Sequence, residues 1–133
     1  MERVQGIGGI FFKNRGDKAA LLAWYRDALG IPVASWGGFN FRWADMQGAE
    51  HASTTWSPFD ADSDYFGRAD QQWMVNFRVA DLHAMLAQLR AAGADVQDRV
   101  DESEYGKFGW VTDPQGNRIE LWEPPPGGEP DAD

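Results

Sequence analysis

Two parts of the chain resemble each other at a nearly constant spacing, and this internal repeat limits the possible folds more than any other feature. The segment Asp45-Met46-Gln47-Gly48 recurs as Asp113-Pro114-Gln115-Gly116 about 68 residues further on. Upstream, Asp17 precedes one predicted helix and Asp81 precedes another. A repeat of this length indicates two copies of one supersecondary unit, neither of which buries its apolar face alone. We therefore expect the functional site where the two copies face each other.

Each copy is predicted to contain a strand, a helix and three further strands. In the first copy the expected strands cover residues 7–12, 33–36, 39–43 and 51–56, with a hairpin at Gly37-Gly38 and a helix that Asp17 caps and Gly30 ends. In the second copy the expected strands cover 73–79, 95–100, 107–112 and 118–123, and the helix covers 82–92 after Asp81. The predicted fold class is α+β, with two βαβββ modules that form a curved mixed sheet around a cup.

The size of the chain allows one hydrophobic core. The sequence has 133 residues, of which 43% are hydrophobic, and this is enough for one compact domain but hardly for two. We predict a single domain over residues 1–123, with module one at about 4–57, a solvated acidic linker at about 58–72 and module two at about 73–123. Residues 124–133 are rich in proline, glycine and acidic residues and are predicted to form a flexible tail.

Charge and hydropathy exclude two classes of partner. The formal net charge of −9 repels phosphate backbones, and no cluster of Lys and Arg interrupts it, so nucleic acid is not expected to bind. No apolar run approaches the roughly 18 residues of a membrane span, and the N-terminus lacks the apolar core of a signal peptide. The absence of cysteine fits a reducing compartment. The sequence thus predicts a cytoplasmic protein that contacts neither nucleic acid nor membrane.

The end of the second copy carries a family resemblance. The segment Tyr105–Pro124 resembles the closing segment of the vicinal oxygen chelate superfamily, which includes glyoxalase I, bleomycin-resistance proteins and extradiol dioxygenases. Trp24–Gly30 is similar to the end of the first helix in that superfamily. Together with the paired βαβββ order, the resemblance spans nearly the whole chain up to the tail. It implies two modules around a ligand cup and, in the metal-using members, a divalent ion held by the first and last strand of each module.

Most of the metal-binding positions that this resemblance implies carry residues that cannot bind a metal. Glu120 matches the last of the four positions. The other three positions carry the apolar residues Ile7, Ala52 and Met74. Apolar side chains cannot ligate an ion, so no metal and no other cofactor is expected. The alternative is a shifted strand register that makes a divalent metal site from Gln5, His51, Gln72 and Glu120, whose ligands suit Mg, Mn, Ni or Zn.

Without a metal, Glu120 needs another role, because a carboxylate in a partly dry cup must be paired, hydrogen-bonded or protonated. It could accept a cationic group of a ligand, act as a general base, or form a structural pair with Arg78 or Arg42. Strand alternation turns Val75, Phe77 and Val79 toward the helix, and turns the residues between them into the cup. The predicted catalytic residues are Glu120 as a base and Tyr105 as an acid from a loop. The predicted ligand-binding residues are Asn76, Arg78, Trp56, Trp110 and His51.

The sequence therefore predicts a protein that binds a small organic molecule in the cup without the usual metal. Two alternatives remain: a metal-dependent lyase, isomerase or dioxygenase of the superfamily, and a non-catalytic protein that sequesters a drug. Seven tryptophans provide apolar surface for an interface, and we expect a homodimer.

Overall fold

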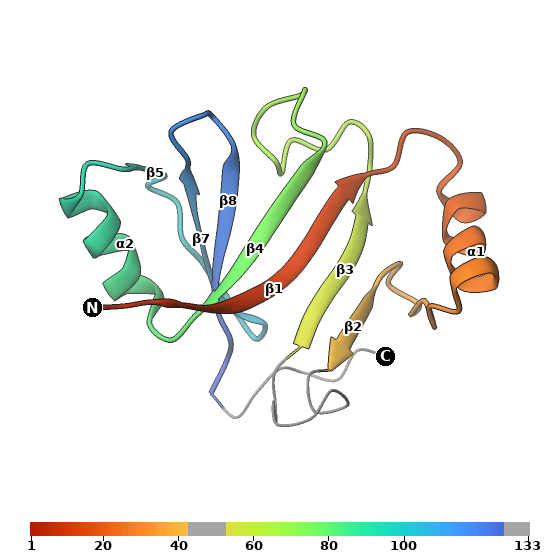
Figure 1. Ribbon diagram of the computed structural model, residues 1–133, viewed down its shortest axis with the longest axis horizontal. Helices are drawn as coiled ribbons and strands as arrows, with labels where there is room; N and C mark the ends of the chain where they lie inside the picture. The colour runs from red at the N-terminus through yellow and green to blue at the C-terminus, as the bar shows by residue number, and fades with distance from the viewer. Residues whose placement is uncertain (43–52, 127–133) are drawn as a thin grey trace.

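A computed structural model describes residues 1–42 and 53–126 of the chain. These residues form one eight-stranded mixed sheet with a helix at either end of it, as Figure 1 shows. The α+β class and the curved mixed sheet that the sequence predicts are confirmed. Within the described ranges, no helix has the length and apolar character that crossing a membrane requires.

In both halves a strand is followed by a helix and then by further strands, as predicted, although the strands that the structure describes after each helix differ in number from the prediction. The first half contains β1 (Val4–Lys13), α1 (Lys18–Leu29), β2 (Phe39–Arg42) and β3 (Ser53–Phe59). The second half contains β4 (Trp73–Val79), α2 (Leu82–Ala91), β5 (Asp95–Val96), β6 (Asp101–Ser103), β7 (Gly106–Thr112) and β8 (Arg118–Glu123).

The sheet topology repeats between the halves. The strand order is β2-β3-β1-β4-β8-β7-β5, and β6 pairs with β7 beside this path. In each half the first strand lies parallel to the last one, β1 beside β3 and β4 beside β8. The two first strands, β1 and β4, pair antiparallel in the centre and join the halves. The internal repeat in the sequence is thus a repeat of sheet topology about the β1–β4 pair.

Both helices begin where the sequence predicts. The side chain of Asp17 accepts a hydrogen bond from the amide of Ala20, and that of Asp81 accepts one from the amide of Ala84. Each bond satisfies one of the amides that a helix N-terminus leaves without a partner. Gly30 ends α1 in the left-handed conformation with φ of 71°, which glycine adopts at little cost.

Two predicted strand assignments differ from the structure. Residues 33–36 form no strand, because Ala34 and Gly38 close a turn through the bond from the Ala34 amide to the Gly38 carbonyl, 2.8 Å. Pro32 cannot donate to a strand at this place, and Gly37 has φ of 94°. The strand expected over 95–100 is confined to Asp95–Val96, and a separate strand, β6, begins only at Asp101. The strand expected near 51–56 is present from Ser53 onward, whereas residues 51 and 52 and the expected turn at 45–48 lie outside the described residues.

The two helices contribute unequally to the core. From α2, the side chains of Leu82, Met85 and Leu86 are buried against Val79, Val111 and Leu121 on one face of the sheet, which we call the outer face. Phe77 packs against this cluster, so the predicted direction of Phe77 and Val79 is confirmed. No side chain that the structure describes in α1 is fully buried; Tyr25 reaches the rings of Phe12 and Trp56 at 6.0 and 4.7 Å. The second half therefore holds the better-packed core.

Because the two helices are packed unequally, a leucine-to-alanine substitution should lower the free energy of unfolding by different amounts in α2 and α1. Leu86→Ala, in the buried cluster, should lower the free energy of unfolding by about 2–5 kcal/mol, the range for a leucine cavity in a core. Leu22→Ala in α1 should cost about half of that or less, because its side chain is only partly buried. Urea denaturation of both variants measures the difference. Equal losses would contradict the unequal packing.

Candidate functional site

Glu120 lies at the centre of a buried polar cluster on the inner face of the sheet, opposite α2. Its side chain is 1% exposed. The Oε1 atom accepts a hydrogen bond from Nδ2 of Asn76 at 2.7 Å, and Oε2 accepts one from Nε1 of Trp110 at 3.0 Å. The hydroxyl of Tyr65 also donates to Oε2. Both carboxyl oxygens are thus satisfied by neutral donors, and none of the three donors is an arginine.

The sheet register brings three of these residues together. Asn76 on β4 and Trp110 on β7 both lie directly opposite Glu120 on β8, so the three side chains form one row across adjacent strands. Side chains in such a row point to the same face of a sheet. Gly8 on β1 permits this packing, because a β-carbon there would collide with Oδ1 of Asn76. The prediction that Asn76, Trp110 and Glu120 share a face is therefore correct.

Tyr65 is the member of the cluster that the sequence analysis missed. It belongs to the linker between β3 and β4, and its ring stacks on Phe59 at 5.4 Å and meets Trp110 edge-on at 5.8 Å. The next residue, Phe66, is completely buried. The expected solvated linker is thus wrong for its middle, although Asp60 and Asp62 are exposed. The adjacent aromatic pair inside an acidic segment was the available signal, since such rings gain most from burial.

Burial controls the protonation of the cluster. It raises the pKa of Glu120 above its ordinary value, and the hydrogen bonds from Tyr65, Asn76 and Trp110 oppose this effect without reversing it. Burial, followed by the charge of Glu120, also raises the pKa of the Tyr65 phenol, which therefore keeps its proton. Arg99 and Arg118 lie over the Trp110 ring at 5.2 and 5.3 Å from its centroid. A carboxyl group with a raised pKa thus accepts a hydrogen bond from an indole that has two guanidinium groups over its ring.

The remaining predicted site residues lie further from the carboxyl group. Arg78 stands over the Trp122 ring at 5.7 Å. Tyr105 is 56% exposed, and its main-chain carbonyl accepts a hydrogen bond from Trp122. Trp56 packs with Phe12 and Tyr25 on the outer face, so its predicted place in the cup is wrong. The reason is register: Trp56 lies opposite Ile10, which points away from the cup. His51 lies outside the described residues.

The alternative metal site does not assemble from the described residues. Because β1 and β4 run antiparallel, Val4 lies opposite Val79 whereas Phe12 lies opposite Trp73. Gln5 and Gln72 therefore stand at opposite ends of the central strand pair, roughly 20 Å apart at about 3.3 Å per residue. Side chains cannot bridge that distance to one ion. The register shift that would unite these two glutamines is ruled out by the pairing of the strands.

The surroundings of Glu120 do not fit the divalent ion that the superfamily implies. Two of its neighbours present N–H groups and the third a phenol that retains its proton, and such donors repel a cation. The apolar residues at the implied positions include Met74, which is buried, and Ile7, which is partly exposed. Within residues 1–42 and 53–126, no group of three His, Cys, Asp or Glu side chains is placed to hold a metal.

Comparison with known proteins identifies related domains. A family model described as a glyoxalase-like domain matches residues 10–122. Among curated proteins, none matches the chain significantly in sequence. The structure is similar to methylmalonyl-CoA epimerase from Mycobacterium tuberculosis, with a TM-score of 0.64, 19% identity and coverage of 92% of this chain and 90% of that one. At this level of identity, the similarity concerns the fold.

Two further solved structures extend the comparison. Methylmalonyl-CoA epimerase of Streptomyces coelicolor, in complex with 2-nitronate-propionyl-CoA, has a TM-score of 0.68 and 15% identity, and the match covers 97% of this chain and 100% of that one. The Mn(II)-bound glyoxalase from Novosphingobium aromaticivorans has a TM-score of 0.50 and 20% identity, with 98% of this chain and 43% of that chain covered. Proteins with different chemistry thus share this arrangement of strands.

The raised pKa of Glu120 predicts a pH dependence of stability. A carboxyl whose pKa is higher in the folded than in the unfolded state stabilises the fold most below its unfolded value, near pH 4.5. That contribution is lost as the pH rises through the folded value. Relative to Glu120→Gln, the native protein should therefore become less stable as the pH rises from about 4.5, by at most about 1.4 kcal/mol per pH unit. Urea denaturation of both proteins from pH 4.5 to 8 tests this. A difference that stays constant or grows with pH would contradict it.

Proposed function

The chain belongs to the glyoxalase-like domain family of the vicinal oxygen chelate superfamily, and from this premise we propose that it binds a small organic molecule at Glu120 and uses this carboxyl group for proton transfer without a metal. The observation that carries the proposal is a fully buried carboxyl group held by three neutral donors, with its pKa raised by burial. A base is most effective when its pKa lies near the working pH, and burial moves a carboxyl group in that direction.

The proposed chemistry is the removal of a proton from carbon next to a carbonyl group, and its return. The ionised Glu120 takes the proton, and negative charge develops on the carbonyl oxygen of the ligand. Arg78 on the same face is a candidate to stabilise that charge, and Tyr105 on the nearby β6–β7 turn is a candidate acid. Asn76 and Trp110 then position the carboxyl group, because both already donate to it. Tyr65 donates to Oε2, so it competes with a ligand for that oxygen.

Two other functions have less support. Sequestration of a cationic drug would use the negative charge and the aromatic rings. However, Arg99 and Arg118 already lie over the Trp110 ring, so a cationic ligand would meet two positive charges there. A metal-dependent reaction would need ligands that the described residues do not bring to Glu120. Proton transfer by protein groups agrees best with the donors around the carboxyl group.

Exchange of ligand hydrogens with deuterated water tests this function. The first compounds to try are acyl-CoA thioesters, because fold neighbours include an epimerase in complex with methylmalonyl-CoA, followed by small 2-oxo and carboxylic acids. Exchange catalysed by the native protein should slow by about 100-fold or more in Glu120→Gln, the usual contribution of a general base. Glu104→Gln, on an exposed loop, is the matched control and should keep full activity.

Three other results would change or contradict the proposed role of Glu120. Ligand binding weakened in Glu120→Gln without any exchange in the native protein would favour a binding protein over an enzyme. A large loss of stability in Glu120→Gln with unchanged binding and exchange would make the carboxyl group structural. Elemental analysis showing one tightly bound transition metal per chain would contradict the metal-free chemistry.

We also propose that two copies of the chain associate. The outer face of the central strand pair lies between the helices, and it leaves Val4, Ile7 and Trp73 exposed. A second copy is the simplest partner for this apolar strip, with an interface of about 2,000 Å² in total. Light scattering should give about twice the 14.9 kDa mass of one chain, and Trp73→Glu should give the monomer. A native monomer at micromolar concentration would contradict this prediction.

A further inference from the structure

The linker between β3 and β4 closes over the carboxyl group of Glu120. Residues 60–72 cross the inner face of the sheet, where Tyr65 donates to Glu120 and Phe66 packs with Phe11, Met74 and Trp110. The Tyr65 ring also fills the space between Phe59 and Trp110. Because Glu120 is almost completely buried, a ligand that hydrogen-bonds to Oε2 has to take the place of Tyr65. The linker therefore has to move before the carboxyl group can act.

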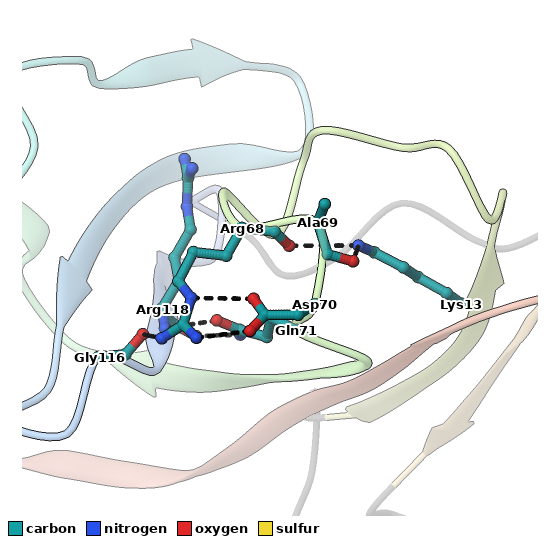
Figure 2. A network of polar contacts seen from close by, with 7 residues as sticks. All are labelled: Lys13, Arg68, Ala69, Asp70, Gln71, Gly116 and Arg118. Carbon is teal, nitrogen blue, oxygen red and sulfur yellow. Dashed lines mark hydrogen bonds and ion pairs between the residues drawn. The ribbon is translucent and has the colours of Figure 1, made fainter.

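Lys13 holds the second half of the linker to β1. Its ammonium group donates to the carbonyls of Arg68 and Ala69, at 3.3 and 3.2 Å, as Figure 2 shows. The residue is 4% exposed, and its Nζ atom lies 5.4 Å from the centre of the Phe66 ring. No carboxylate in the described part of the chain lies within ion-pair distance of it. The hydrogen-bonding partners of this buried charge are thus two carbonyls of the linker itself.

A second attachment joins the linker to β8. The side chain of Gln71 donates to the carbonyl of Arg118 at 2.9 Å and accepts from its amide at 2.8 Å, as one strand does with another. Arg68 pairs with Asp70 and donates to the carbonyl of Gly116 at 3.3 Å (Figure 2). These contacts are neutral or exposed, so water can replace them at small cost. Of these polar attachments, the contact at Lys13 is the one made by a buried charge.

We propose that residues 60–72 form a gate over Glu120, that Lys13 is the positioning residue that keeps it closed, and that the Tyr65 phenol occupies the place of the ligand. This inference rests on the proposed role of Glu120 and concerns the access to it. A buried ammonium group needs hydrogen-bond acceptors, and in the closed gate the carbonyls of Arg68 and Ala69 supply them. Both of these residues are exposed, so their carbonyls can be hydrated when the gate opens. Opening therefore exposes Lys13, Tyr65, Phe66 and the inner-face residues that they cover, while the separate cluster beneath α2 stays packed.

The closed gate also defines what can replace it. A ligand that displaces Tyr65 has to bring a hydrogen to Oε2 of Glu120, from a hydroxyl, an N–H or the acidic C–H of the proposed reaction. It also has to bring a flat group that fits between the rings of Phe59 and Trp110. A ligand with a carboxylate at that position would face the charge of Glu120 without a donor. The gate thus selects neutral donors and rejects anions at this point of the site.

Chemical labelling of Glu120 measures the opening of the gate. The full-length protein is treated with a water-soluble carbodiimide and glycine ethyl ester, and the rate of modification at Glu120 is followed by mass spectrometry. Lys13→Met should be labelled about tenfold faster or more, since one charge-assisted hydrogen bond corresponds to about a tenfold to hundredfold change in an equilibrium. Lys107→Met is the control, because its ammonium lies 3.6 Å from Glu123 and contacts no residue of the linker. Its labelling rate should equal that of the native protein.

Hydrogen exchange separates a gate from a general loss of stability. In Lys13→Met, amides of residues 60–72 should exchange faster while amides of β7 and β8 keep their protection. Equal labelling of Glu120 in Lys13→Met and the native protein, or faster exchange throughout the sheet, would overturn the proposal. If Lys13→Met does not fold, the native protein provides the test. The amide of Gly67, which donates to the carbonyl of Asp64, should then exchange by a local opening much more frequent than that of the β8 amides. If the amide of Gly67 and the amides of β8 exchanged at one common rate, the gate would be contradicted.

These measurements need no ligand, so they are independent of the proposed function. A confirmed gate together with unchanged chemistry in Glu120→Gln would leave the gate standing and remove the role of Glu120. Conversely, a catalytic Glu120 whose labelling does not respond to Lys13 would leave the function standing and remove the gate.

Discussion

The burial of one carboxyl group determines how the inner face of this protein is built. Removing Glu120 from water is costly unless its oxygens find donors, and those donors come from three places in the chain: β4, β7 and the linker. Each donor has further consequences. Asn76 leaves room only for a glycine at position 8 of β1, and Trp110 has two guanidinium groups over its ring. Tyr65 belongs to the linker, so its bond to Glu120 keeps the linker on the inner face of the sheet. Both the donor cluster and the position of the linker over it therefore depend on the carboxyl group of Glu120.

The two halves of the internal repeat share one sheet topology but supply different residues to the site. In both halves the first strand pairs in parallel with the last. The second half places Asn76 and Glu120 in one row at this pairing, whereas the described pairs of β1 with β3, from Gly9 and Thr55 to Lys13 and Phe59, contain no carboxylate. The first half instead contributes Phe11 to the inner cluster and Lys13 to the linker. One copy thus supplies the polar centre, and the other supplies support for the segment that covers it.

Much of this arrangement could be predicted from sequence, because periodic patterns and caps are local. Asp17, Gly30 and Asp81 mark helix ends by their own backbone chemistry, and strand alternation correctly turned Asn76 and Glu120 to one face. The errors concern non-local geometry. The antiparallel central pair separates Gln5 from Gln72, and pairing with Ile10 turns Trp56 to the outer face. The contact of Tyr65 with Glu120 joins residues 55 positions apart, and no local pattern encodes it.

The central claim is that Glu120 is a desolvated carboxyl group that holds its proton more tightly than an ordinary glutamate. A titration of the carboxyl carbon by ¹³C NMR, with Glu120→Gln to assign the signal, measures this directly. We predict that the signal of Glu120 titrates clearly above the ordinary value of about 4.5. We also predict that Tyr65→Phe moves the pKa of Glu120 further up, because one of the hydrogen bonds that favour the charged form is lost. A Glu120 signal that titrates at or below the ordinary value would show a charged, solvated carboxylate and would contradict the account.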